Sequence, residues 1–394
     1  MFPFLKTGVA ASCFSITKNV CRTFSANYGV LAVIYMKGAE KVKVAQRSFG
    51  NDVLLFTVEN DHGVSIEVTN FGARIVNLFV LTESGRNNIV LGFDSIEDYK
   101  KETYYGATIG RVAGRIKNGE FSIGESRFQT SVNQLGNTLH GGSPGFDEKI
   151  WDYEVKETDE SASIIFSTHS PDGENGFPGN LKVSVTYTLD NLNIWSVSYL
   201  AKSDKDTVFN PTNHVYFNLT GHPSHPIDDH FLQIFSGEFA PVNDDTTVTG
   251  EKRSTIGTPY DFRTPKKLKS TFEAADAEVK KVQGIDHPFF LTRPGLHQTA
   301  AKLISPDEKI TVEVYTEEPA IVIYTANFVK GVPLMHGEKL IQHGGITFET
   351  QAAPGAIEFE DFGDNLLLAG QNYTSHTKYK IEVSTHSAEV SSWC

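Results

Sequence analysis

Hydrophobic and polar residues alternate along most of the chain beyond about residue 51. Over residues 181–189 every second position is apolar, and a polar residue stands between each pair. After an Asp-Asn-Leu-Asn turn, residues 194–200 alternate again, with Trp195, Val197 and Tyr199 on one face. A period of two is typical of a strand with one buried face, so these two stretches predict a β-hairpin.

The same alternation recurs along the chain, between turn-forming clusters of Gly, Asn and Pro. It is found at residues 64–70, 74–81, 121–129, 153–168, 310–315, 321–326 and 379–385. Short helices are predicted only at 95–101 and 270–281. Closely spaced strands joined by such turns indicate an all-β fold, an antiparallel sandwich or barrel. Since neither an internal repeat nor a shift in composition occurs, we expect a single domain over residues 41–394.

Composition and charge exclude several classes of protein. The 394 residues are 39% hydrophobic, enough for a sizeable core, and the net charge is −13. A surface this acidic argues against nucleic acid as a partner, and no apolar run approaches the ~18 residues of a membrane helix. The three cysteines, at positions 13, 21 and 394, allow no disulfide framework across the core. We expect a cytoplasmic protein with neither a nucleic-acid nor a membrane partner.

The first 39 residues differ from the rest, because they hold four basic residues and no acidic one. This composition is compatible with a transit or signal peptide, but arginines are few and an Ala-x-Ala-like cleavage site is missing. A start at Met36, which ordinary charged sequence follows at once, is the simpler interpretation. We therefore treat residues 1–40 as an N-terminal extension outside the fold.

Candidate chemistry is concentrated in four segments where ionisable side chains interrupt apolar strands or stand in Gly-rich turns. They are residues 137–142 around His140, 210–219 around His214, 284–290 around Asp286 and 344–351 around Glu349. Taken alone, each also has a structural interpretation. A lone His in a strand is more often a hydrogen-bonded structural residue than a catalytic one, and an Asp often caps a turn.

Metal, nucleotide and nucleophile sites are less favoured by the sequence. His222, His225 and His230 are close together, but their spacing and two prolines predict a solvated loop and not a metal-binding helix. The chain has no P-loop, no dinucleotide fingerprint and no Gly-x-Ser-x-Gly nucleophile elbow. We expect no metal and no cofactor.

Taken together and in this order, the segments resemble the aldose 1-epimerases, also called galactose mutarotases, from about residue 51 to 380. The matching stretches are 70–75 (Asn-Phe-Gly-Ala-Arg-Ile), 110–116 (Gly-Arg-Val-Ala-Gly-Arg-Ile), Leu-His-Gly-Gly with 145–147, 171–179, 213–219, 285–287 and 348–351. The resemblance implies a large antiparallel β-sandwich of the galactose mutarotase-like supersandwich type. It also implies an isomerase that interconverts the α and β anomers of aldohexoses such as galactose and glucose.

The resemblance further implies that Glu349 is the general base and His214 the general acid. The residues that it implies hold the sugar are Arg115, His140, Tyr216 and Asp286. Two positions differ from a common family pattern, since many members have Asn at the position of Gly114 and Gln at that of Val322. Some bacterial members share both differences, which affect sugar contacts and sugar preference and not the catalytic pair.

The chemistry suits these residue types. Anomer interconversion needs a base for the C1 hydroxyl and an acid for the ring oxygen, and the two roles are exchanged when the ring closes again. Near neutral pH, Glu349 must then be ionised while His214 is protonated, and we expect Asp286 to favour the charged imidazole. Either Phe289 or Tyr216 is expected to lie against the apolar face of the sugar.

Three alternatives remain open. A sugar-binding module that has lost catalysis would not need the acid–base pair. An epimerase of phosphorylated hexoses needs several arginines for the phosphate, and only Arg111 and Arg115 occur in the relevant motifs. A glycoside hydrolase needs two carboxylates across the sugar, for which Asp286 and Glu349 are candidates. The oligomeric state, monomer or homodimer, does not follow from the sequence.

Overall fold

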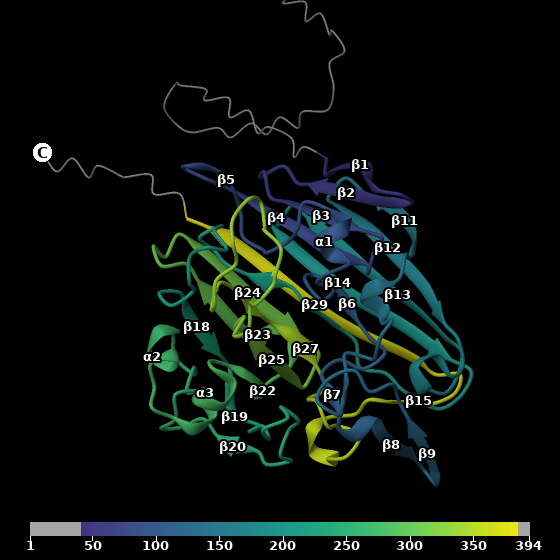
Figure 1. The fold of residues 1–394 in the computed structure, drawn as a ribbon. Helices are drawn as coiled ribbons and strands as arrows, with labels where there is room; N and C mark the ends of the chain where they lie inside the picture. The colour runs from purple at the N-terminus through teal and green to yellow at the C-terminus, as the bar shows by residue number, and fades with distance from the viewer. Residues whose placement is uncertain (1–40, 385–394) are drawn as a thin grey trace, which may run out of the picture. The chain divides into compact units, whose positions relative to one another are not determined.

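A large antiparallel sheet organises the computed structural model, which describes residues 41–384. The C-terminal strand β29, yellow in Figure 1, pairs with β14 on one side and β24 on the other and so joins the two halves of this sheet. In spatial order its nine strands are β11 (Asp152–Glu157), β12 (Ser161–Ser170), β13 (Leu181–Asp190), β14 (Ile194–Ser203), β29 (Asn372–Val383), β24 (Ile310–Thr316), β23 (Gly295–Ile304), β18 (Phe231–Ile234) and β21 (Lys266–Lys267).

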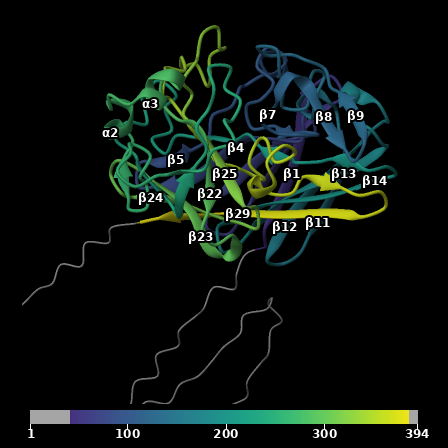
Figure 2. The same cartoon turned by 90° about the horizontal axis from the view of Figure 1, so that it is seen from below.

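Smaller sheets pack on one face of the nine-stranded sheet (Figure 2). One of them contains β1 (Lys43–Gly50), β2 (Val53–Glu59), β3 (Ser65–Thr69), β4 (Arg74–Thr82) and β5 (Gly85–Asn88). Another contains, in spatial order, β20 (Arg253–Ser254), β19 (Ser236–Phe239), β22 (Asp286–Leu291), β25 (Ala320–Tyr324) and β27 (Glu349–Gln351).

The remaining strands form two-stranded pairs, and the helices are short. The pairs are β6 (Thr108–Ile109) with β16 (Thr212–Asn213), β7 (Arg115–Ile116) with β10 (Thr138–Leu139), β8 (Glu120–Ile123) with β9 (Ser126–Gln129), β15 (Thr207–Val208) with β28 (Leu366–Leu367), and β17 (Tyr216–Phe217) with β26 (Ile346–Thr347). The α-helices are α1 (Ile96–Tyr99), α2 (Lys269–Phe272) and α3 (Ala277–Val282), and the 3₁₀ helices are η1 (Lys117–Gly119), η2 (Phe146–Glu148), η3 (Glu174–Gly176) and η4 (Glu360–Phe362). No helix in the described range 41–384 is long and apolar enough to cross a membrane.

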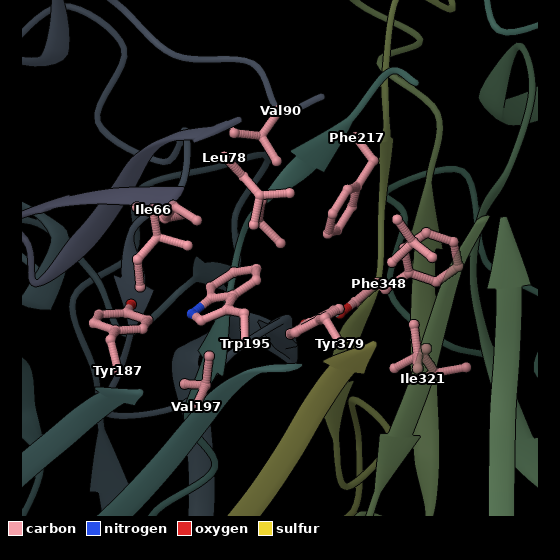
Figure 3. Packing of buried hydrophobic residues seen from close by; sticks show 14 of the residues in the cluster. Ile66, Leu78, Val90, Tyr187, Trp195, Val197, Phe217, Ile321, Phe348 and Tyr379 are labelled. Carbon is pink, nitrogen blue, oxygen red and sulfur yellow. The ribbon is translucent and has the colours of Figure 1, made fainter. Parts of the chain in front are cut away.

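The core lies between the large sheet and the smaller ones (Figure 3). Alternate residues of β14 face inward, and the Trp195 ring stacks on Tyr379 of β29 at a centroid distance of 4.6 Å. Ile66 and Leu78, from the five-stranded sheet, are fully buried in the same cluster. The alternation of apolar residues therefore buries one face of each strand, and the predicted all-β antiparallel sandwich is confirmed.

The predicted hairpin is also confirmed, as β13 and β14, whereas some boundaries differ. Residues 121–129 and 153–168 each form a hairpin of two strands, β8–β9 and β11–β12. The helix predicted at 270–281 is two helices, because Asp276 adopts an extended backbone and its carboxylate caps α3 by accepting from the N–H groups of Glu278 and Val279. The expectations about residues 1–40 and the cysteines lie outside the described residues.

Arg111, from the Gly-Arg-Val-Ala-Gly-Arg motif, has a structural role in the fold. Its side chain is buried, and its guanidinium donates to the Ser170 hydroxyl at 2.8 Å and to four main-chain carbonyls. Those carbonyls belong to Ser170, Pro171, Pro178 and Gly179. The Pro-Asp-Gly-Glu-Asn-Gly-Phe-Pro-Gly segment is thus wrapped around one cation, which explains how a loop rich in Gly and Pro holds a fixed shape.

Replacing Arg111 by Met is expected to lower the free energy of unfolding by about 3 kcal/mol or more, because the carbonyls of Ser170, Pro178 and Gly179 each lose a buried hydrogen bond at ~1–3 kcal/mol. The exposed Arg127 offers a matched control, for which Met should change stability by no more than ~0.5 kcal/mol. Urea unfolding of both variants measures this. Equal stabilities for the two variants would show that the carbonyls find other donors.

Candidate active site

A cleft of about 590 Å³ is lined by residues from β7, β22, β25 and β27, the strands labelled in Figure 1, and from the loops around them. All six residues that the family resemblance implied for the site line this cleft. They are Arg115, His140, His214, Tyr216, Asp286 and Glu349. Residues that lie up to 234 positions apart, from 115 to 349, therefore meet in one cavity.

The register of β17 with β26 brings the two central residues together. Tyr216 pairs with Thr347, and continuing this antiparallel register by two residues sets His214 opposite Glu349. His214 Nε2 lies 3.4 Å from Glu349 Oε1, and the Thr347 hydroxyl donates to the same oxygen at 3.1 Å. His214 is only 5% exposed and Glu349 only 3%, so this acid–base contact is almost free of bulk water.

One face of the sheet β22–β25–β27 forms a wall of the cleft. Asp286 pairs with Tyr324 across β22 and β25, and Val322 pairs with Glu349 across β25 and β27, and all four line the cavity. Side chains alternate along a strand, so Phe289, three residues after Asp286, points to the opposite face and is fully buried in the core. The expectation that Phe289 lies against the sugar is therefore wrong.

His140 is held by the pair β7–β10. The register sets it opposite Gly114, whose N–H donates to His140 Nδ1 at 3.2 Å. With Nδ1 accepting, the proton of the neutral ring is on Nε2, which leaves that nitrogen as a donor. Gly114 has φ of +74°, and a Cβ there would lie 2.5 Å from Cγ of Pro354. Close packing against Pro354 thus favours glycine at this position, where many family members have Asn.

Arg115 connects two walls of the cleft. Its Nε donates to Gln134 Oε1 at 2.8 Å, and its Nη2 lies 3.9 Å from Asp286 Oδ2. Gln134 was missed from the sequence, because a Gln in a polar loop carries no signal of its own. Arg111 is bound to main-chain carbonyls and does not line the cleft. Of the two arginines that could hold a phosphate in the phosphorylated-hexose alternative, only Arg115 is therefore in place.

Aromatic rings surround His214, and the sequence analysis missed most of them. The Tyr104 ring lies 6.1 Å from that of His214 and 4.7 Å from that of His140. The Tyr216 ring lies 5.1 Å from His214 and stacks on Tyr105 at 4.5 Å. The Tyr-Tyr pair at 104–105 precedes a recognised motif, but no periodicity distinguishes these rings from core aromatics.

Within residues 41–384, one group has the ligand atoms to hold a metal ion, namely His140, His214 and Glu349, whose atoms lie within 4.8 Å of one another. The bond from Gly114 to His140 places the proton on Nε2, so this nitrogen offers a hydrogen bond and not a lone pair. These three side chains therefore suit hydrogen bonds to hydroxyl groups better than the binding of a metal ion.

The other histidine cluster comprises His222, His225 and His230. His230 is buried and accepts from a backbone N–H, so the prediction of a solvated loop is only partly correct.

Burial shifts the pKa values of Glu349 and His214 in opposite directions. Burial, with the negative charge of Asp286, raises the pKa of Glu349 to about 8, although the Thr347 hydrogen bond and the Arg115 charge act the other way. Burial also lowers the pKa of His214 to about 4, and the Arg115 charge acts in the same direction. Between these values the pair holds one proton, which resides on the carboxyl. Asp286 thus acts on Glu349 and not, as expected, on the imidazole.

Comparisons with known proteins agree on one family. The family model described as "Aldose 1-epimerase" matches residues 54–380. The galactose mutarotase of Bos taurus is 36% identical over 332 residues, covering 84% of this chain and 94% of that protein. The aldose 1-epimerase of Escherichia coli (strain K12) is 35% identical over 337 residues, covering 84% and 96%. The structure of galactose 1-epimerase from Lactobacillus acidophilus NCFM superimposes with a TM-score of 0.78 at 32% identity, covering 88% of this chain and 100% of that one.

The shared proton predicts a bell-shaped dependence of kcat/KM on pH, with limbs near the pKa values of about 4 and about 8. Asp286→Asn removes a negative charge that raises the pKa of Glu349, so the upper limb is expected to move to lower pH. Asp159→Asn, an exposed position in the turn after β11, makes the same charge change and should leave both limbs in place. An upper limb that stays fixed in Asp286→Asn contradicts this account, whatever the loss in amplitude.

Proposed function

The chain belongs to the aldose 1-epimerase family, and on this premise we propose that Glu349 is its general base and His214 its general acid. The protein is an isomerase that interconverts the α and β anomers of aldohexoses. The observation that carries the assignment of the pair is the buried contact of 3.4 Å between Nε2 and Oε1. Relatives named for galactose support galactose as a substrate.

The reaction divides into two proton transfers at the sugar. The Glu349 carboxylate takes the proton of the C1 hydroxyl while the His214 imidazolium gives one to the ring oxygen, and the C1–O5 bond breaks. The open-chain aldehyde rotates about C1–C2 and presents its other face. The ring oxygen then attacks C1, the imidazole takes its proton back, and the carboxyl returns a proton to the new C1 hydroxyl.

The number of protons on the pair is the same in the resting and in the reactive state. At neutral pH the resting pair holds one proton, on the carboxyl, because the pKa of Glu349 is raised and that of His214 is lowered. The reactive pair, carboxylate and imidazolium, also holds one. Moving a proton from Oε1 to Nε2, 3.4 Å apart, therefore prepares the site without any exchange with bulk water.

The other four residues implied by the family hold the sugar. Arg115 and the Nε2–H of His140 donate to its hydroxyl groups, and Asp286 accepts from one. Tyr216 packs against it with its ring. Val322 stands directly across from Glu349 on β25, so an apolar side chain adjoins the reacting centre where many family members have an amide.

We further propose that residues 41–394 form one epimerase domain after the extension 1–40, and that the protein acts in the cytoplasm on free sugars. The binding-module alternative is less favoured, because a pure binder has no use for a buried acid–base pair. In the hydrolase alternative Asp286 would face Glu349 as a second catalytic carboxylate. Here Asp286 pairs with Arg115, and Glu349 has His214 as its partner.

Polarimetry of freshly dissolved α-D-galactose tests the assignment. The wild-type protein should accelerate the decay of optical rotation, and Glu349→Gln and His214→Ala should each lower kcat by ~10²–10⁴-fold, the usual contribution of a general acid or base. The matched controls are Glu154→Gln and His62→Ala, both at exposed positions, and they should retain the wild-type rate.

Wild-type protein that binds galactose without accelerating the decay would support the binding-module alternative. If instead both variants of the pair keep more than about a tenth of the wild-type kcat, the acid–base assignment is wrong.

A further inference from the structure

Catalysis needs the imidazolium form of His214, yet burial opposes it. The side chain is only 5% exposed, and the nearby Arg115 guanidinium disfavours a second positive charge. The Glu349 carboxylate, 3.4 Å away, attracts the cation once the proton has moved, and any other group that stabilises the cation makes this form more frequent. The contacts of His214 with its aromatic neighbours identify the groups available.

We propose that the rings of Tyr104 and Tyr216 stabilise the imidazolium of His214 through cation–π contacts, and so set how often the acid–base pair reaches its reactive form. The proposal rests on the proposed function, because it assigns a purpose to the charged form of the general acid. Tyr104 and Tyr216 are in this respect positioning residues that act through His214.

The geometry fits such contacts. The Tyr216 ring centroid lies 5.1 Å from that of His214 with the planes inclined by 42°, and the Tyr104 ring lies 6.1 Å away at 28°. Both distances are near the ~6 Å within which a cation is attracted to a ring face. His140, by contrast, meets the His214 ring edge-on at 90°. Two phenol rings from different parts of the chain thus lie next to one imidazole, and neither is perpendicular to it.

Both rings are held in place before any sugar arrives. Tyr216 is only 5% exposed, stacks on Tyr105 at 4.5 Å and meets Tyr324 at 6.1 Å. Tyr104 is half-buried and meets the His140 ring at 4.7 Å with an inclination of 70°. A fixed ring needs no rearrangement when the charge appears, which is the condition for effective electrostatic stabilisation in a site sheltered from water.

The other titratable groups around His214 do not supply this stabilisation in every state. Arg115, on β7, opposes the cation, and burial lowers the pKa of His140 so far that it stays neutral. Asp286, on β22, is paired with Arg115, and Glu102 lines the same cleft. The Glu349 carboxylate attracts the imidazolium only after it has lost its own proton. The tyrosine rings attract it whether Glu349 is charged or not.

This difference gives the proposal its own pH signature. A weaker ring contact makes the imidazolium rarer in the singly protonated pair, so kcat falls. It also destabilises the doubly protonated pair, so the lower limb of the pH profile moves to lower pH. The upper limb is the loss of the last proton from the Glu349 carboxyl beside a neutral imidazole, and it should not move. Misplacement of a side chain would lower kcat without moving the lower limb.

The experiment replaces Tyr104 by Phe and then by mono-, di- and trifluorinated phenylalanine, which weaken the negative face of the ring with little change in shape. Tyr104→Phe keeps the ring and is the reference from which the fluorinated series is measured. Across the fluorinated series kcat should fall by about 3- to 30-fold. The pKa of the lower limb should fall by the logarithm of the same factor. The same series at Phe235, a partly exposed ring outside the cleft, is the matched control and should change neither.

A readout independent of activity is the titration of His214 followed by ¹⁵N NMR, with its signals assigned by their absence in His214→Gln. Its midpoint should fall along the fluorinated series at position 104. A flat series in both readouts overturns the proposal, and so does a loss in Tyr104→Phe as large as in Tyr104→Leu, because the hydroxyl would then be the active part. These outcomes leave the proposed function intact, whereas full activity in His214→Ala would remove the proposed function itself.

Discussion

The contact between His214 and Glu349 depends on the antiparallel register of β17 with β26. A strand presents alternate side chains to opposite faces, so a slip of one residue would turn the imidazole or the carboxylate into the core. The register is fixed from the core side, where Phe217 and Phe348 are fully buried and their rings lie 5.8 Å apart. Phe217 also meets Tyr379 of β29 at 5.6 Å. Through the buried rings of Phe217 and Phe348, the large sheet thereby fixes His214 and Glu349 on the side that faces the cleft.

Burial of this contact has two opposite effects that the site combines. It raises the pKa of the Glu349 carboxyl to about 8 and lowers that of the imidazole to about 4, so the resting pair is neutral over the range between these values. A neutral pair avoids the cost of two buried charges, while a single proton transfer over 3.4 Å converts it into the acid and the base that the reaction needs. Asp286, Arg115 and the tyrosine rings, which all line the cleft, then tune the balance between the two forms.

The sequence predicted most of the fold, because the strands alternate clearly and the hairpin of β13 and β14 has an unambiguous turn. It predicted the four segments of the site, and the family resemblance identified six residues that line one cleft. The alternation on β22 could also have excluded Phe289, since it lies three residues from Asp286 and so on the opposite face. Gln134 and Tyr104 could not be predicted from the sequence, because their roles depend on tertiary contacts with Arg115 and His214 that no local pattern encodes. The environment of Arg111 is of the same kind, since its partners lie about 60 residues away.

The most direct test of a shared proton in a buried pair is infrared difference spectroscopy of the sugar-free protein, wild type minus Glu349→Gln, between about pH 5 and pH 9. The account predicts the carbonyl stretch of a protonated carboxyl at about pH 6, absent from the variant, which gives way to a carboxylate band as the pH passes the Glu349 pKa of about 8. A carboxylate band for Glu349 already at pH 6, unchanged up to pH 9, would contradict the account.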